Sequence, residues 1–182
     1  MVDIETIKNL LPVKSATADI FIDDDKTYVM KVLKKTNSWE LSDVIYREVH
    51  AVKHLREHGV DWVPEIIVVL GNKIIMDYCG EPISRQNAPK DYKDQIENII
   101  NTLWELNLQH NDIMWKNKKS EFLVKDNKVY LVDWGWSSIN NDLSWGVGLD
   151  KKKPGGISED QSVLSKLDKV ITWNTWIKIE IM

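Results

Sequence analysis

The sequence predicts an α+β fold: a small antiparallel sheet carrying one helix, followed by a mainly helical segment. Three observations support this fold. Apolar residues alternate along several short stretches of residues 1–79, as they do in the strands of hairpins. One longer stretch between these strands has helical periodicity instead. After residue 90 the apolar spacing is again mostly helical, apart from one short hairpin.

The first elements are a hairpin and a helix. ADIFI (18–22) and KTYVMKVLKK (26–35) alternate in polarity on either side of an aspartate-rich turn, which predicts two paired strands. Ser38 is a good N-cap residue, and the apolar residues after it recur at helical spacing up to Gly59, where the helix is expected to end.

Later segments show the same two periodicities. The remaining predicted elements are two strands around Gly71-Asn72 within 64–78, a linker at 79–82, a helix over 92–108, short strands at 122–124 and 128–132, and a final amphipathic helix over 158–173. The chain therefore reads as strands with one helix, then a helix, a hairpin and a closing helix.

Composition narrows the class of protein. The chain has 182 residues, enough for one compact domain or two small lobes. Its net charge of −4 gives no indication of non-specific nucleic-acid binding. Cys79 is the single cysteine, which excludes an intramolecular disulfide, and no apolar run reaches membrane-spanning length. Since the N-terminal residues also lack the shape of a signal peptide, we expect a cytoplasmic protein.

Several polar residues match the needs of phosphoryl transfer. That reaction uses a cation on the nucleotide phosphates, oxygen ligands for Mg²⁺, and a carboxylate that orients the attacking hydroxyl. Lys31 closes the strand run YVMK, and Glu48 lies on the following helix, where it could pair with Lys31. Asp112 precedes Asn117 with D-x-x-x-x-N spacing, and Asp133 ends the later hairpin.

Three of these segments together resemble the signature motifs of the protein-kinase-like superfamily. YVMK (28–31) is similar to the V-A-I-K strand, HNDIMWKN (110–117) to the catalytic loop H-R-D-L-x-x-x-N, and DWG (133–135) to D-F-G. Order and spacing agree along residues 18–135. The resemblance implies a two-lobed protein-kinase-like fold, with an N-lobe at 1–79 and a reduced, mainly helical C-lobe at 80–182. Together they would form one catalytic domain that uses ATP and Mg²⁺.

The resemblance also implies catalytic and metal-binding roles for the matching residues. Lys31 would contact the α and β phosphates, and Glu48 would hold Lys31. Asp112 would accept or orient the proton of the acceptor hydroxyl. Asn117 and Asp133 would bind Mg²⁺.

The remaining implied contacts are with the nucleotide. The segment matching the family's glycine-rich phosphate loop has no glycine, and its small residues Ser15, Ala16 and Thr17 would approach the phosphates. Met76 would lie at the back of the adenine pocket. The backbone from Asp77 to Cys79 would form the hinge that hydrogen-bonds adenine.

The short segment after DWG narrows the resemblance further. No A-P-E motif follows it, and the plan is similar to small atypical serine/threonine kinases of the Bud32 type. The triplet H-N-D is also similar to choline and aminoglycoside phosphotransferases. We therefore expect a Mg-ATP-dependent kinase that phosphorylates a hydroxyl, with Ser or Thr of a protein, including this chain itself, as acceptor. A partner protein could present that acceptor, and neither a membrane nor a nucleic acid is expected as partner.

Three alternatives remain open. The enzyme could phosphorylate a small molecule such as a sugar or an amino alcohol. The glycine-free loop could instead indicate a pseudokinase or nucleotide-binding scaffold. Finally, HLREH (54–58) matches the H-x-x-E-H pattern of a zinc hydrolase, and His50, His54 and His58 follow i, i+4, i+8 spacing. These histidines fit more simply as the outer face of the helix that carries Glu48.

Overall fold

The computed structural model describes residues 13–14, 18–34, 41–115 and 119–139, and four positions near the C-terminus. Those four positions, Val163, Lys166, Leu167 and Ile171, are helical, as the predicted helix over 158–173 requires. The predicted phosphate-loop residues Ser15, Ala16 and Thr17 and the predicted metal ligand Asn117 lie outside the described residues.

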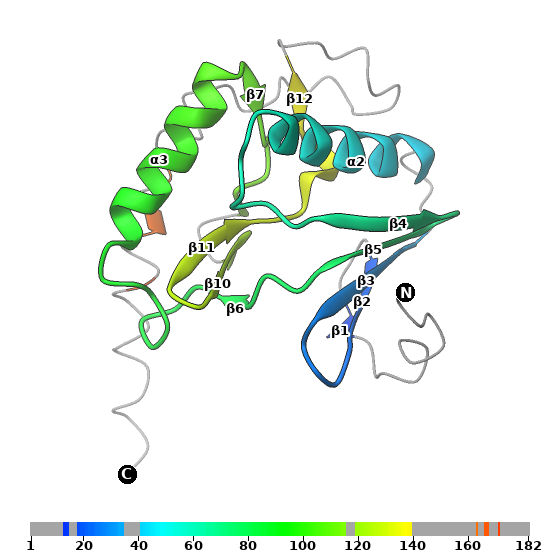
Figure 1. Ribbon diagram of the computed structural model, residues 1–182, viewed down its shortest axis with the longest axis horizontal. Helices are drawn as coiled ribbons and strands as arrows, with labels where there is room; N and C mark the ends of the chain where they lie inside the picture. Colours follow the sequence, from blue (N-terminus) through cyan, green and yellow to red (C-terminus); the bar gives the residue numbers. More distant parts are fainter. Residues whose placement is uncertain are drawn as a thin grey trace.

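A five-stranded antiparallel sheet forms the first part of the fold (Figure 1). Its order is β1 (Val13–Lys14), β2 (Ala18–Ile22), β3 (Tyr28–Leu33), β5 (Lys73–Asp77) and β4 (Ile66–Leu70). The two predicted hairpins are confirmed, because β2 pairs with β3 and β4 with β5. In the middle of the sheet, Lys31 stands opposite Ile20 on one side and Ile74 on the other.

Helix α2 (Leu41–Glu57) packs beside this sheet and explains the position of Glu48. Its buried apolar residues recur at helical spacing, at Val44, Ala51, Val52 and Leu55. Glu48 lies on the same stripe, four residues from Val44 and from Val52, and is 2% exposed. A carboxylate on a buried stripe needs a partner, because an unpaired buried charge is strongly unfavourable.

Helix α3 (Tyr92–Glu105) buries Ile96, Ile99, Ile100 and Leu103 against the main core. The predicted extension of this helix to Leu108 is wrong. Asn107 adopts a left-handed conformation with φ of 49°, which ends the helical path, and Leu108 begins β7 (Leu108–Gln109) instead. An apolar residue one turn beyond a helix looks the same from the sequence whether it continues the helix or starts a strand.

The later hairpin is confirmed as β10 (Phe122–Lys125) and β11 (Lys128–Leu131). Its turn residues, Asp126 and Asn127, both have positive φ, as a two-residue hairpin turn requires. The prediction of a plain linker over 79–82 is wrong in part. Glu81–Pro82 forms β6, which pairs with β10 and makes a three-stranded sheet.

Short strands complete the described fold. β12 (Ser138–Ile139) pairs with β7, β8 (Met114–Trp115) pairs with β9 (Lys119–Ser120), and a 3-10 turn spans η1 (Trp134–Trp136). Residues 80–139 thus contain seven short strands, β6 to β12, and one α-helix where they are described. The expectation of a mainly helical second half is wrong for these residues, since paired segments of two residues have no visible periodicity.

One main core joins α2, α3 and the β10–β11 hairpin around the fully buried Trp134. Val163, Leu167 and Ile171 pack into the same core. Figure 1 shows α3 alongside this hairpin, and α2 lying over the five-stranded sheet on the side of β4. Within the described residues no helix is long and apolar enough to span a membrane.

Candidate active site

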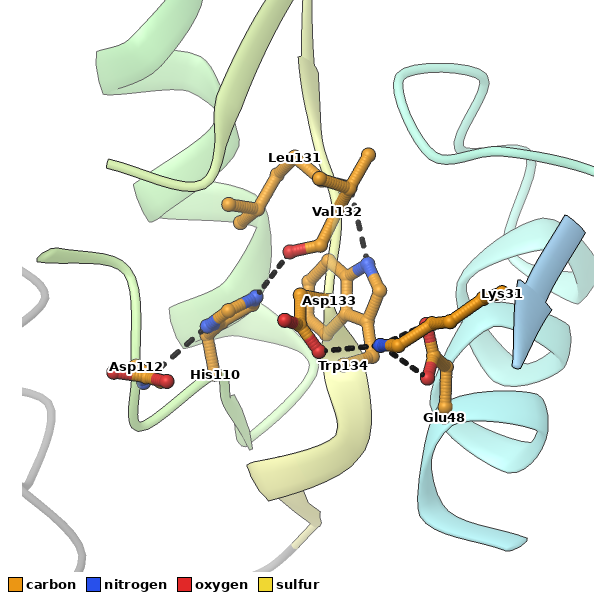
Figure 2. A network of polar contacts seen from close by, with 8 residues as sticks. All are labelled: Lys31, Glu48, His110, Asp112, Leu131, Val132, Asp133 and Trp134. Atoms are coloured by element: carbon orange, nitrogen blue, oxygen red, sulfur yellow. Dashed lines mark hydrogen bonds and ion pairs between the residues drawn. The ribbon is translucent and has the colours of Figure 1, made fainter. Parts of the chain in front are cut away.

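Three elements bring Lys31, Glu48 and Asp133 into direct contact (Figure 2). Lys31 Nζ on β3 lies 2.8 Å from Glu48 Oε2 on α2 and 2.6 Å from Asp133 Oδ1, just after β11. The Lys31 and Glu48 side chains are 7% and 2% exposed, whereas Asp133 is 34% exposed. The cluster therefore has a buried end at Glu48 and a half-open end at Asp133.

Electrostatics in this cluster follow from one cation between two carboxylates. Burial alone would lower the pKa of Lys31, but the attraction of Glu48 and Asp133 outweighs it and holds that pKa above its ordinary value. Burial raises the pKa of Glu48, and the negative charge of Asp133 adds to this rise, while Lys31 opposes it. With all three groups ionised the cluster carries a net charge of −1, so it favours a cation.

His110 joins the backbone around Asp112 to the backbone before Asp133. Its ring is fully buried, and burial lowers its pKa to about 4, so the ring is neutral at physiological pH. Nε2 lies 2.9 Å from the Val132 carbonyl oxygen, and the Asp112 N–H donates to Nδ1 over 3.3 Å. The neutral tautomer with its proton on Nε2 satisfies both contacts. The buried ring thus fixes Asp112 relative to Asp133.

Asn111 provides a second tie in the same loop. Its amide donates to the Trp136 carbonyl oxygen over 2.9 Å and to Ser138 Oγ over 3.1 Å. Both Asn111 and Asp133 have left-handed backbone conformations, with φ of 68° and 65°. Such conformations are strained for residues other than glycine and cluster at functional sites.

The Trp134-Gly135 pair anchors this segment to the core. Trp134 Nε1 donates to the Leu131 carbonyl oxygen over 3.0 Å, and its ring meets His110 edge-on with centroids 4.6 Å apart. A Cβ on Gly135 would lie 2.7 Å from Val44 Cγ1 of α2. Trp134 is fully buried, and close packing at Gly135 keeps α2 beside Asp133.

The other predicted site residues that the structure describes lie in two places, beyond Asp133 and at the end of β5. Figure 2 shows Asp112 beyond Asp133 on the side away from Lys31. Met76 is buried in β5, Asp77 ends that strand, and Cys79 is buried just beyond it, where burial and Asp77 raise its pKa to about 12. Sequence reasoning did not identify His110 or Asn111 as the residues that hold the loop, although their place beside Asp112 was the available signal.

The histidine stripe of α2 does not form a metal centre. His58 Nδ1 lies 2.8 Å from the His54 carbonyl oxygen, and the two rings are 4.4 Å apart. Burial and the neighbouring imidazoles His58 and His50 lower the pKa of His54. In the part of the chain that the structure describes, no group of three or more histidine, cysteine, aspartate or glutamate residues is placed to hold a metal ion.

The donor set at the open end of the cluster suits Mg²⁺ bound to a nucleotide. One oxygen of Asp133 contacts Lys31, and Figure 2 shows the other pointing toward the side on which Asp112 lies. Mg²⁺ is usually held by one or two carboxylates together with phosphate oxygens, so Asp133 could serve as such a ligand while Lys31 meets the phosphates.

Comparison with solved structures defines the class of fold: the chain has a protein-kinase-like fold. Two structures of Rio2 kinase from Chaetomium thermophilum share it. One is an ADP/Mg²⁺-phosphoaspartate complex with a TM-score of 0.59 and 18% sequence identity, matching 87% of this chain and 54% of that one. The other has a TM-score of 0.59 and 16% identity, over 87% and 55% of the two chains.

The extent of these likenesses is limited. The chain spans about half the length of the Rio2 structures that it matches. No profile of a known protein family matches the sequence, and no curated protein matches it. The predicted protein-kinase-like fold is confirmed, and the likeness to Rio2 kinase does not single out the Bud32 type.

Proposed function

We propose that this chain is a Mg-ATP-dependent phosphotransferase that moves the γ-phosphoryl group to a hydroxyl, acting as a small atypical serine/threonine protein kinase of the Bud32 type. One observation carries the proposal: the buried Lys31 is held 2.8 Å from Glu48 and 2.6 Å from Asp133. A buried lysine that is held between two carboxylates keeps one side-chain orientation, so its ammonium group can present a positive charge to phosphates at a fixed position. The protein-kinase-like fold supports the same function.

In this proposal the chain's residues divide the work of positioning and charge stabilisation. Lys31 contacts the α and β phosphates, and Glu48 keeps its ammonium group in place. Asp112 orients the acceptor hydroxyl and takes its proton. Asp133 and Asn117 hold Mg²⁺, which when bound would supply positive charge to the phosphate oxygens.

In this proposal the nucleotide would bind between the two predicted lobes, 1–79 and 80–182. Met76 and the backbone from Asp77 to Cys79 would contact its adenine, and Ser15, Ala16 and Thr17 would contact its phosphates. The acceptor approaches from the Asp112 side, where a partner protein could present it.

The direct test is transfer of radiolabel from γ-labelled ATP with Mg²⁺, first with no added acceptor and then with a generic protein. Asp112→Asn removes the proton acceptor and is expected to slow transfer by about 10²- to 10⁴-fold. Asp133→Asn is expected to abolish it. The matched control is Asp126→Asn in the exposed hairpin turn, where asparagine adopts positive φ readily. Transfer that survives both site substitutions would show that the active site lies elsewhere.

The chemistry of the label identifies the acceptor class. A phosphoester on Ser or Thr is stable to hydroxylamine, whereas an acyl phosphate on a carboxylate is cleaved by it. The phosphoaspartate named for the Rio2 complex is a reason to include this treatment. ATP turnover with a sugar or amino alcohol but no labelled protein would indicate a small-molecule kinase. Mg²⁺-dependent binding of ATP without turnover would indicate a nucleotide-binding scaffold.

A further inference from the structure

Two lysines from distant parts of the chain converge on Tyr78, the middle residue of the predicted hinge. Lys26 lies in the turn between β2 and β3, and Lys125 ends β10. Their ammonium nitrogens lie 5.8 Å and 5.6 Å from the centroid of the Tyr78 ring. Both distances fall within the range of cation–π attraction.

The backbone of Tyr78 is held from both sides as well. Its N–H donates to the Thr27 carbonyl oxygen over 2.9 Å, next to Lys26 in the chain. Its carbonyl oxygen accepts a hydrogen bond from Lys125 Nζ over 3.1 Å. The hinge is thereby attached to the five-stranded sheet through one backbone group and to the three-stranded sheet through the other.

Glu81 closes the arrangement. Glu81 Oε1 accepts hydrogen bonds from the Tyr78 hydroxyl over 2.6 Å and from Lys26 Nζ over 2.8 Å. The hydrogen bonds from Lys26 and Tyr78 lower the pKa of Glu81, while burial and Glu81 raise the pKa of Tyr78. Glu81 is therefore an anion and Tyr78 a neutral donor at physiological pH. We call these four residues, Lys26, Tyr78, Glu81 and Lys125, the hinge clamp.

The chain just after Tyr78 is pressed against β10. Gly80 has φ of 100°, and a Cβ on it would lie 2.0 Å from the Val124 carbonyl oxygen. The next residue, Glu81, pairs with Val124 in the β6–β10 ladder. The hinge segment is thus fixed at Tyr78 and again two to three residues later.

The Lys26–Glu81 ion pair of the hinge clamp is not explained by its contribution to the stability of the fold. The Lys26 and Glu81 side chains are 59% and 58% exposed, and exposed ion pairs contribute little to the stability of a fold. Their common contact with Tyr78 does restrict the orientation of the hinge backbone, because it limits rotation of the ring and of the peptide groups next to it.

We infer that the hinge clamp positions the Asp77 and Cys79 backbone groups toward the nucleotide base and so sets the affinity and the base selectivity of nucleotide binding. The inference rests on the proposed function. Lys26, Glu81 and Lys125 are positioning residues in this account, since they act through the hinge backbone.

The test compares Lys125→Met and Lys26→Met with Lys128→Met. Lys128 is a matched control on the same hairpin: it pairs with Asp61 and lies 5.4 Å from the Tyr130 ring centroid. Lys125→Met removes a hydrogen bond to the hinge. If one hydrogen bond between the hinge and the base is then no longer aligned, the affinity for the nucleotide falls about fivefold. We expect Kd for Mg-ATP to rise about fivefold in both hinge variants, with a smaller change for Mg-GTP. In kinetics, KM for ATP should rise while kcat stays unchanged.

A second measurement needs no nucleotide. Hydrogen exchange of the 77–80 amides should accelerate in Lys125→Met and Lys26→Met, stay unchanged in Lys128→Met, and recover in Lys125→Arg. Unchanged exchange at 77–80, or equal loss of ATP and GTP affinity, would overturn the inference even if the wild type binds ATP. A wild type that binds no nucleotide, with exchange at 77–80 still accelerated in the variants, would overturn the proposed function and the assigned purpose of the clamp while leaving its geometry in place.

Discussion

Replacing Lys31 by methionine gives the sharpest stability test of the Lys31–Glu48–Asp133 cluster. Methionine is close in shape to the lysine side chain, so the change removes the charge and little packing. Glu48, which is 2% exposed, then loses the cation 2.8 Å away, and the second carboxylate, Asp133, remains close to it. We expect the free energy of unfolding to fall because a buried charge is left without a counter-ion.

The size of the expected loss in the free energy of unfolding follows from these distances. Unit charges 2.8 Å apart attract by about 6 kcal/mol at an effective dielectric constant of about 20, before the cost of desolvating them is subtracted. Breaking a buried pair by removing one partner costs about 3–5 kcal/mol. The contact with Asp133 adds less, because that side chain is 34% exposed and solvent screens it.

Urea denaturation followed by tryptophan fluorescence measures this loss, and a double-mutant cycle identifies its cause. Lys31→Met with Glu48→Gln leaves no uncompensated charge at the buried end, so most of the lost stability should return. The loss in Lys31→Met should be smaller at pH 5 than at pH 8. Burial raises the folded-state pKa of Glu48 above its ordinary value. The stability of Lys31→Met therefore declines as pH rises from the ordinary pKa of a glutamate to the raised pKa of Glu48, because Glu48 ionises in the folded protein without a counter-ion.

Two results would contradict this account of the Lys31–Glu48–Asp133 cluster. A loss below about 1 kcal/mol in Lys31→Met would mean that the cluster behaves like an exposed ion pair. A double variant no more stable than Lys31→Met would mean that packing, rather than the uncompensated charge of Glu48, causes the loss.

Three further predictions concern the same region. Gly80→Ala should destabilise the fold by about 3 kcal/mol, since it adds a steric clash to a left-handed backbone. Gly71 also has positive φ but has open space around it, so Gly71→Ala should cost about 1 kcal/mol. Urea denaturation measures both losses. Gly135→Ala should cost about 1–3 kcal/mol by pressing on Val44, and adding Val44→Ala should cost less than the sum of the two single changes, as a double-mutant cycle would measure. Finally, because burial lowers the pKa of His110 to about 4, the unfolded chain takes up a proton first as pH falls below about 6.5. The contribution of His110 to stability should therefore drop by about 2 kcal/mol from pH 7.5 to pH 5, measured as the change with pH in the difference between wild type and His110→Gln.

Each of these predictions has a clear opposing result. Equal losses in Gly80→Ala and Gly71→Ala would mean that the close approach to β10 can relax. Strict additivity of Gly135→Ala and Val44→Ala would mean that the two positions are not energetically coupled, so that packing at Gly135 does not hold α2 beside Asp133. A difference between wild type and His110→Gln that is flat between pH 7.5 and pH 5 would mean that burial does not lower the pKa of the His110 ring.

The elements whose signals are local could be predicted from the amino-acid sequence. The β2–β3 and β10–β11 hairpins follow from alternation and turn residues within a few positions, and α2 follows from its apolar spacing. Part of the site could also be predicted from the sequence. Glu48 lies on the buried stripe of α2, so a paired carboxylate could be expected there. Motif order then indicated the protein-kinase-like fold that solved structures share.

The contacts between segments that are far apart in the chain could not be predicted from the sequence. Pairing of β6 with β10, the end of α3 at Glu105, and the bridge made by His110 all depend on which backbone groups meet after packing. The hinge clamp joins Lys26 to Lys125 through Tyr78, although no periodicity relates these positions. Local preference fixes how a few neighbouring residues turn, whereas burial and hydrogen bonding over long loops select which distant side chains come together.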